Sequence, residues 1–225
     1  METILITGAS RGIGLAVAKK FLAEGWFVVG TSTTDSIKGI DSENFIPIKL
    51  NLADPKSIEE ASQNIKDLGK EIDVLINNAG VLHEKGNPVK IKIESLRSTL
   101  EVNVIGTIDF TEHIIPLIKS GGHIINMSSR MGSFETKELG VRSAGSYPAY
   151  RISKAALNMY THALAGRLEQ ENIKVSSIEP GWVKTDMGGP YADRTPEYVG
   201  EDVYNLVQGD VESGNFWHQG KTRAW

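Results

Sequence analysis

The amino-acid sequence predicts an α/β fold in which a doubly wound parallel sheet of about seven strands is covered by helices on both faces. Short apolar runs alternate with longer stretches of helical periodicity, and a glycine-rich turn joins the first strand to the first helix. Strands are expected at residues 3–7, 27–31, 45–50, 73–77, 123–128, 174–178 and 215–217. Helices are expected near residues 13–24, 55–68, 94–118, 150–171 and 196–207. No repeat or linker interrupts the alternation, so we expect one domain over residues 1–225.

Local patterns support the individual elements. The first strand reads Thr-Ile-Leu-Ile, an apolar and β-prone run. In the stretch 94–118, apolar side chains step by four positions and so share one helical face: Leu96, Leu100, Val104 and Ile108. The connection 32–44 is short and polar, and we expect no helix in it.

Composition excludes several classes of function. The formal net charge of −4 argues against a nucleic-acid partner, and the absence of cysteine rules out disulfides and thiol catalysis. The five histidines are scattered without ligand spacing, so we expect no metal site. Because the first predicted strand begins at Thr3, we expect no signal peptide, and because no apolar run has membrane-spanning length, we expect no membrane-spanning helix. We expect a cytoplasmic protein with a small-molecule substrate and no membrane partner.

The turn after the first strand favours an anionic ligand. Glycine lets the backbone approach a ligand closely, and the unpaired N–H groups and dipole of the following helix attract a pyrophosphate. The spacing is G-x-x-x-G-x-G, and no Lys-Ser/Thr pair follows, which argues against a P-loop nucleotidase. The expected pyrophosphate contacts are Gly8, Ser10, Arg11, Gly12, Ile13 and Gly14.

Residues at the end of the second strand predict NADP rather than NAD. An acidic residue at this point normally accepts a hydrogen bond from the adenosine ribose of NAD. Here Ser32 and Thr33 stand instead, and Arg11 adds a cation on the neighbouring turn. A 2′-phosphate could pair with Arg11 and accept hydrogen bonds from both hydroxyls. The alternative is that Arg11 is only a solvated residue at a helix start.

Tyr150 and Lys154 form a candidate acid–base pair. They lie four positions apart in a predicted helix, so their side chains share a face. A nearby ammonium stabilises a phenolate, and we therefore expect Lys154 to lower the pKa of Tyr150. Such a phenol could donate a proton to a carbonyl oxygen as hydride arrives at the carbon.

The chain resembles a classical short-chain dehydrogenase/reductase of the carbonyl reductase and sniffer-type branch, and the resemblance spans nearly the whole sequence. The supporting motifs occur in the family's order: Thr7-Gly-Ala-Ser-Arg-Gly-Ile-Gly14, Asn77-Asn-Ala-Gly80, Asn103, Ser128-Ser-Arg-Met-Gly132, Tyr150-Arg-Ile-Ser-Lys154, Pro180-Gly-Trp-Val-Lys-Thr185 and the tail Gly214-Asn-Phe-Trp-His-Gln-Gly-Lys221. The resemblance implies a Rossmann-type fold and an NADPH-dependent reductase of aldehydes or ketones.

The resemblance also implies a role for each matching residue. Tyr150 would be the general acid, and Lys154 would assist it and hold the nicotinamide ribose. Ser129 would donate a hydrogen bond to the substrate oxygen, and Asn103 would position a water that connects Lys154 to solvent. Further coenzyme contacts would be Asn51, Leu52, Asn78, Ala79, Gly80, Pro180, Gly181, Val183 and Thr185.

Three regions bear on substrate and assembly. The connection from Ser129 to Tyr150 is longer than in many family members, and we expect it to form an extra loop over the active-site mouth. The segment 182–200 is expected to be a lid whose Trp182, Met187 and Tyr191 make an apolar pocket. Family members often form homodimers or homotetramers through two long helices, here 94–118 and 150–171. Small residues that would permit such packing are Ala155, Ala156, Ala163, Ala165 and Gly166.

Two other functions fit parts of the pattern. The glycine turn also satisfies the G-x-S-x-G motif of serine hydrolases, and Ser10, Asp186 and His218 occur in hydrolase order. No earlier loop precedes the first strand to complete an oxyanion hole, which argues against this reading. A non-catalytic NADP-binding sensor on the same fold is the other alternative, although a sensor has no need of acid–base groups.

Overall fold

A computed structural model of the chain describes residues 1–84, 86, 88, 90–135 and 145–225. Within them one sheet has the strand order β3-β2-β1-β4-β5-β6-β7-β8. All neighbours are parallel except β7 and β8, which pair antiparallel. The strands are β1 (Thr3–Ile6), β2 (Phe27–Ser32), β3 (Phe45–Lys49), β4 (Ile72–Asn77), β5 (Ile118–Met127), β6 (Lys174–Ile178), β7 (Asn215–His218) and β8 (Lys221–Arg223).

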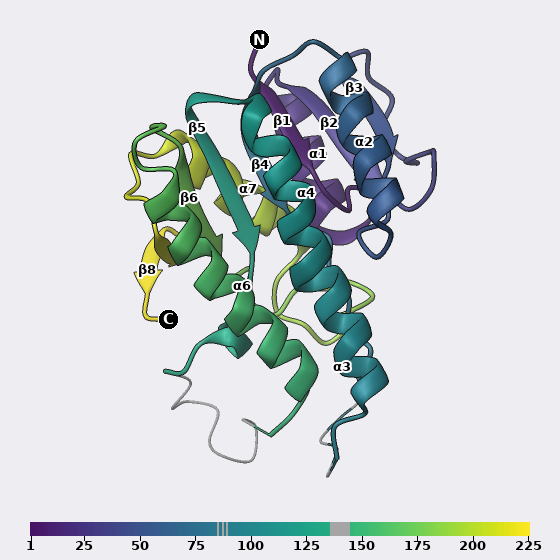
Figure 1. Cartoon of the computed structure of the whole chain (residues 1–225), viewed down its shortest axis with the longest axis vertical. Helices are drawn as coiled ribbons and strands as arrows, with labels where there is room; N and C mark the ends of the chain where they lie inside the picture. Colours follow the sequence, from purple (N-terminus) through teal and green to yellow (C-terminus); the bar gives the residue numbers. More distant parts are fainter. Residues whose placement is uncertain (85, 87, 89, 136–144) are drawn as a thin grey trace.

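Helices cover both faces of the sheet, so the predicted doubly wound Rossmann-type fold is confirmed (Figure 1). The front face in this view carries α2 (Pro55–Asp67), α4 (Thr107–Ile114) and α6 (Pro148–Arg167). The opposite face carries α1 (Gly12–Ala23) and α7 (Pro196–Gln208). Helices at 13–24, 55–68 and 196–207 were predicted to within one residue at each end, and the connection 32–44 contains no helix, as expected.

Two apolar cores lie on the two faces of the sheet. Successive side chains of a strand point to opposite faces. In β1, Leu5 therefore packs in the core beneath α2, α4 and α6, whereas Ile4 and Ile6 pack in the core beneath α1 and α7. All three are fully buried, as expected for a parallel sheet covered on both sides.

The prediction of one continuous helix over residues 94–118 was wrong. The structure has α3 (Ile93–Leu100), then a π-helical turn η1 (Glu101–Gly106), then α4, then a short 3₁₀ turn η2 (Ile115–Leu117). Pro116 lies in the 3₁₀ turn, and Ile118 already pairs with Ile72 in the sheet. Strand β5 thus begins at Ile118 rather than at His123. The helix predicted over 150–171 also begins earlier, with Pro148 in its first turn, and ends at Arg167.

The sheet has eight strands instead of about seven. The additional strand β8 follows β7 through a two-residue turn, in which Gln219 and Gly220 have φ values of 49° and 73°. Positive φ at both positions is the signature of a tight hairpin turn whose twist matches the strands. This hairpin places Arg223 opposite Phe216 at the edge of the sheet.

Candidate functional site

One large cleft opens at the carboxyl ends of the central strands. In this strand order the direction of winding reverses between β1 and β4, which is where open α/β sheets bind ligands. The cleft has a volume of about 1220 Å³. Every residue predicted for coenzyme binding or catalysis lines it, except Gly14 and Asn103.

The glycine turn packs tightly against the residues that follow β4. Gly8 has φ = 70°, and a Cβ on it would lie 3.0 Å from the Cα of Ala79. The Asn78 amide donates to the carbonyl oxygens of Thr7 (2.9 Å) and Gly8 (3.2 Å). Gly14 does not face the cleft, but any side chain on it would overlap the carbonyl oxygen of Gly8. Its role is to let α1 approach the turn.

The N-terminus of α1 is free to bind an anion. Arg11, the N-cap, makes no side-chain hydrogen bond to the helix, and the first turn contains no acidic residue. The first N–H groups of the helix thus have no side-chain cap, and they face the cleft beside Gly12 and Ile13. This arrangement suits a phosphate group.

The adenosine end of the cleft differs in detail from the prediction. The Arg11 guanidinium lies 3.3 Å from the Asp186 carboxylate, and both side chains are about four-fifths exposed. Ser32 is buried, and its hydroxyl donates to the carbonyl oxygen of Thr34 (2.6 Å), whereas Thr33 is exposed. Exposed ion pairs contribute at most about 1 kcal/mol, so Arg11 can exchange Asp186 for another anion at little cost.

The catalytic candidates meet at the other end of the cleft. Tyr150 and Lys154 lie in the first two turns of α6, and Ser129 follows β5. The Lys154 ammonium donates to the carbonyl oxygen of Met127 (2.7 Å) and lies 5.6 Å from the centre of the Tyr150 ring. The Ser129 hydroxyl lies within reach of the Tyr150 phenol and favours its ionised form.

Glu84 caps the helix that carries this pair. One of its carboxylate oxygens accepts from the backbone N–H of Ala149 (2.9 Å) and of Tyr150 (3.3 Å). The N-cap residue Tyr147 has φ = 53° and offers no side-chain bond of its own. A residue far away in the sequence therefore supplies the missing cap.

Burial dominates the ionisation of both groups. It raises the pKa of Tyr150 to about 12, and the hydrogen bond with Ser129 opposes this only in part. Burial also lowers the pKa of Lys154 to about 8. The net shift of the Tyr150 pKa is thus upward, opposite in direction to the expected one, because desolvation of the phenol outweighs the interactions that favour the phenolate. At neutral pH Tyr150 is a protonated phenol, which is the proton-donating form.

Asn103 lies just behind the cleft, within the π-helical turn. Its side chain accepts from the N–H of Val81 (2.7 Å) and donates to the Val81 carbonyl oxygen (2.9 Å) and the Ser153 hydroxyl (3.1 Å). A Cβ on Gly80 would lie 3.3 Å from Asn103 Oδ1 and 3.7 Å from Lys154 Nζ. Glycine at position 80 thus keeps open the space between these two polar groups.

The same π-helical turn touches the adenosine end. Gly106 packs so closely on the loop after β3 that any side chain there would overlap the carbonyl oxygen of Leu52. Short π-helical insertions are typical of functional sites. Here the insertion brings one backbone segment into contact with both ends of the cleft.

Several residues that line the cleft were not predicted from the sequence. On α1, Leu15, Ala16 and Lys19 line the cleft together with Gly12. Their spacing of three or four positions is the signal that could have found them. Near Tyr150 the lining also includes Leu82, Arg130, Met131, Ser146, Tyr147 and Arg151. These come from three separate segments, and only folding brings them together.

Three other expectations find different outcomes. Trp182 and Met187 line the cleft, but Tyr191 does not and is 86% exposed. The residues in serine-hydrolase order do not assemble, because Asp186 pairs with Arg11 and His218 hydrogen-bonds to the Glu179 carbonyl oxygen. The extra loop expected between Ser129 and Tyr150 lies partly at residues 136–144, outside the described residues.

Among the described residues, no helix combines the length and the apolar character of a membrane span. In the same part of the chain, no cluster of His, Asp and Glu could hold a metal ion.

Comparison with known proteins decides the family. The sequence model of the short chain dehydrogenase family matches residues 2–195. The protein belongs to this family. As a short-chain dehydrogenase it is an oxidoreductase that uses a nicotinamide coenzyme, and the predicted family is confirmed.

Curated relatives and solved structures agree with this assignment. The short-chain dehydrogenase described here is 31% identical over 230 residues to serine 3-dehydrogenase of Agrobacterium fabrum, covering 96% of this chain and 86% of the relative. It is 30% identical to the 3-oxoacyl-[acyl-carrier-protein] reductase of Escherichia coli K12, covering 84% of this chain and 76% of the relative.

Among solved structures, the carbonyl reductase Sniffer of D. melanogaster superimposes with a TM-score of 0.90 at 29% identity over the whole of both chains. The NADPH-bound carbonyl reductase from chicken fatty liver has a TM-score of 0.88 at 28% identity, covering 100% of this chain and 94% of the other. The chain therefore lies in the carbonyl reductase-like branch of the family.

Proposed function

We propose that this protein reduces an aldehyde or ketone to an alcohol with NADPH, and that Tyr150 is the proton donor. The observation that carries the proposal is the arrangement of the cleft. The partly buried Tyr150 phenol, the neighbouring Ser129 hydroxyl and the Lys154 ammonium line the same cleft as an uncapped helix N-terminus on a glycine turn.

The residues present fit a phosphorylated dinucleotide. Gly8, Gly12 and the first N–H groups of α1 form a cradle for a pyrophosphate, since Cβ atoms there would narrow it. Arg11 and Lys19 are the cations at the adenosine end that would hold a 2′-phosphate. Solved neighbours titled as NADP complexes, including one from Burkholderia multivorans, support this choice. When bound, NADPH supplies the hydride that the carbonyl carbon accepts.

The protein's own side chains handle the oxygen of the substrate. Ser129 donates a hydrogen bond to the carbonyl oxygen, where negative charge develops. Tyr150 transfers its phenolic proton to that oxygen. The Lys154 ammonium stabilises the phenolate that remains, and its pKa of about 8 keeps it largely charged at neutral pH. Asn103 and Ser153 are buried behind these groups, where the Asn103 amide donates a hydrogen bond to the Ser153 hydroxyl.

The substrate end of the cleft favours a carbonyl compound with an apolar body. Leu82, Met131, Trp182 and Met187 line it. Trp182 is fixed in place because its indole N–H donates to the Gly188 carbonyl oxygen (2.7 Å). Apolar walls with a few convergent polar groups are typical of small-molecule sites.

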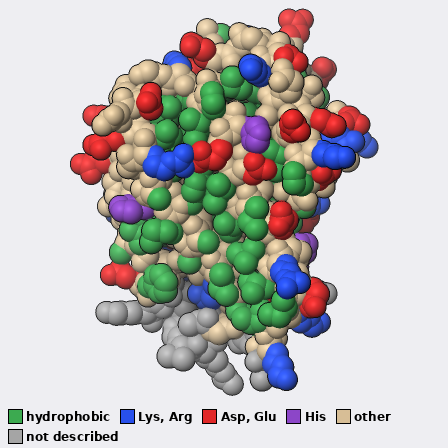
Figure 2. All heavy atoms as spheres, in the orientation of Figure 1, with side chains coloured by type: hydrophobic (Ala, Val, Ile, Leu, Met, Phe, Trp, Pro, Cys, Tyr) green, Lys and Arg blue, Asp and Glu red, His purple; other side chains and the backbone are tan. Residues whose placement is uncertain are grey.

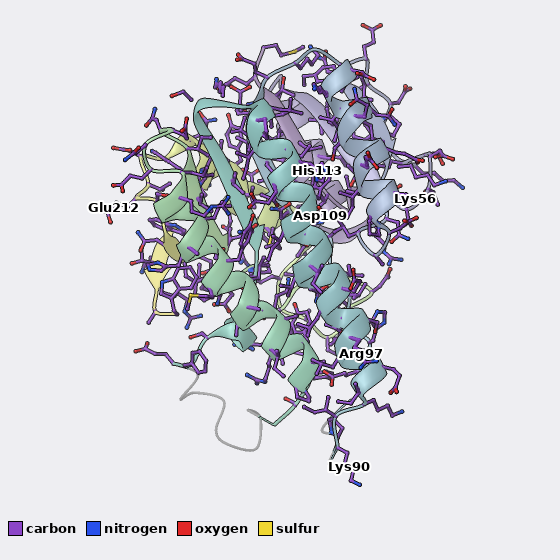
Figure 3. The ribbon with its side chains drawn as sticks, in the orientation of Figure 1. Lys56, Lys90, Arg97, Asp109, His113 and Glu212 are labelled. Carbon is purple, nitrogen blue, oxygen red and sulfur yellow. The ribbon has the colours of Figure 1, made fainter. Side chains whose placement is uncertain are left out.

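A second copy of the chain is the proposed partner. Exposed apolar side chains gather over α6 and the π-helical turn before α4: Ile105 (54% exposed), Ile152 (45%) and Met159 (67%). Figure 2 shows apolar side chains over these helices. Figure 3 shows the side chains of Asp109 and His113 on α4, the helix that follows the π-helical turn. Ala155, Ala156, Ala163 and Gly166 would let two α6 helices approach closely, whereas Ala165 is buried and cannot take part.

Coenzyme oxidation by the purified protein tests the proposed reaction. With a panel of aldehydes and ketones, we expect faster turnover with NADPH than with NADH. Tyr150→Phe should lower kcat at least about a hundredfold, the lower range for general acid catalysis, while NADPH binding is retained. Tyr198→Phe, at an exposed tyrosine on α7, is the matched control and should behave like the wild type. Unchanged turnover in Tyr150→Phe would remove the mechanism, and NADPH binding without turnover on any carbonyl would favour a sensor.

A further inference from the structure

A buried carboxylate stands directly before the turn that walls the cleft at residues 180–185. Glu179 follows β6 and is 2% exposed. Its carboxylate accepts a hydrogen bond from the Arg223 guanidinium on β8. Its backbone N–H donates to the Trp217 carbonyl oxygen (2.7 Å), and its own carbonyl oxygen bonds His218 Nδ1 (3.0 Å). Both β7 and β8 therefore hold this one residue.

The turn after Glu179 is held from a second side. Arg194 donates from one nitrogen to the Pro180 carbonyl oxygen (2.8 Å) and from another to the Asp202 carboxylate on α7 (2.7 Å). Gly181 has φ = 80°, and a Cβ on it would lie 2.8 Å from Arg194 Cδ. The backbone of this turn has little freedom as long as both arginines remain in place.

The end of β8 also reaches the opposite wall of the cleft. The Ser133 hydroxyl donates to the Ala224 carbonyl oxygen (3.2 Å), and the Phe134 N–H donates to the Trp225 carbonyl oxygen (3.3 Å). The Trp225 ring stacks on Phe216 at 5.5 Å. Residues 133–134 directly follow η3 (Arg130–Gly132) and hence the Ser129 segment. Figure 1 shows the chain running from β8 toward this region.

We infer that Arg223 is a positioning residue for coenzyme binding, which it serves by neutralising Glu179 and so fixing the turn 180–185. The inference rests on the proposed function, since Pro180, Gly181, Val183 and Thr185 line the cleft that would hold NADPH. Without Arg223 the Glu179 carboxylate loses its hydrogen-bonded partner, because His218 Nδ1 lies 3.9 Å from the same oxygen and bonds the Glu179 carbonyl oxygen instead. A buried carboxylate in that position must acquire water or a proton, and either change loosens the backbone next to it.

Hydrogen exchange of the coenzyme-free protein tests the mechanical part. The Lys184 N–H donates to the carbonyl oxygen of Arg194, and the N–H groups of Gly188 and Gly189 donate to Thr185 at the end of the turn. In Arg223→Gln we expect these amides to exchange faster, and Arg223→Lys to restore protection in large part. The matched control is Arg167→Gln, which breaks the exposed pair of Arg167 with Glu112 elsewhere on the molecule.

Coenzyme titration tests the functional part. We expect the Kd for NADPH to rise about tenfold or more in Arg223→Gln, because small displacements of positioning groups have effects of this size, and to stay unchanged in Arg167→Gln. If Arg223→Gln does not fold, Glu179→Gln takes its place, because it removes the ion pair that ties the turn to β8. No unpaired buried carboxylate remains in this variant, so exchange and Kd should rise in the same direction but by less. Exchange and Kd equal to those of Arg167→Gln would overturn the inference. A wild-type protein that binds neither NADPH nor NADH would instead refute the proposed function, and the positioning role with it.

Discussion

Lys154 is the residue whose ionisation sets the expected pH dependence. Burial lowers its pKa to about 8, whereas the phenol of Tyr150 titrates at about 12. As pH rises, Lys154 therefore loses its charge while Tyr150 is still protonated. Because the ammonium stabilises the phenolate formed during reduction, kcat/KM should be constant below about pH 7 and fall as pH rises through about 8.

Initial rates of carbonyl reduction across this range check the assignment. The pH dependence of kcat/KM reports groups in the free enzyme. In Lys154→Arg the side chain stays charged at alkaline pH, so the fall in kcat/KM should move to higher pH. A wild-type profile that stays flat to high pH would show that Lys154 does not govern the reaction.

Gly14 is the residue at which adding a single methyl group should lower the stability of the fold most. A Cβ there would overlap the Gly8 carbonyl oxygen and push α1 away from the turn. We expect Gly14→Ala to destabilise the fold by about 1–3 kcal/mol despite the better helix propensity of alanine. The control is Gly166→Ala on α6, where nothing lies within 4 Å. In urea denaturation at protein concentrations where the chain is monomeric, it should be neutral or stabilising by up to about 1 kcal/mol. Equal effects of the two changes would contradict the packing argument.

At the scale of the element, α6 depends on a cap from another segment. Glu84 serves the N–H groups of Ala149 and Tyr150, and its second carboxylate oxygen is buried without a partner among the described residues. Glu84→Ala should cost about 1 kcal/mol of stability, the usual effect of losing an N-cap, and lower kcat by displacing Tyr150. Glu84→Gln keeps an acceptor oxygen and should lose less.

Thermal unfolding and steady-state kinetics on the same preparations check this prediction. Glu60→Ala, at an exposed position in the middle of α2, is the control for removing a negative charge. If Glu84→Ala matched Glu60→Ala in both measurements, the capping role would be refuted.

At the scale of the whole molecule, the apolar surface over α6 predicts self-association. Light scattering should report a mass above that of one chain, and Met159→Glu should reduce it to the monomer, because a charge at the centre of an apolar interface is costly to bury. Lys56→Glu on α2, whose side chain Figure 3 shows away from this surface, should leave the mass unchanged. A wild-type monomer at high concentration would exclude the proposed pair.

The sheet, the cleft and most of its lining were predictable because they depend on local patterns. Alternating apolar runs define β1, β2 and β4, and the glycine turn marks where β1 ends. β8 was missed because its three residues, Lys-Thr-Arg, show no apolar alternation. The π-helical turn was missed because apolar side chains continue through residues 101–106, so the pattern does not reveal an inserted residue.

Properties that depend on the assembled structure could not be predicted. Arg11 and Asp186 are distant in the sequence and meet only because two loops converge at the cleft. The pKa of Tyr150 follows from its burial, which no spacing of Tyr and Lys can report. Glu84 and Arg223 lie in segments without a recognisable motif, and their partners come from other elements.

The contact between Gly106 and Leu52 has a consequence for redesign of this protein. Exchanging the loop after β3 for one that accepts another nucleotide base would shift the carbonyl oxygen on which Gly106 rests. The displacement would pass into the π-helical turn, and three residues earlier that turn holds Asn103 behind the reaction centre. A graft of this loop should therefore be made together with compensating changes around Leu52, and its success should be scored by turnover as well as by coenzyme selectivity.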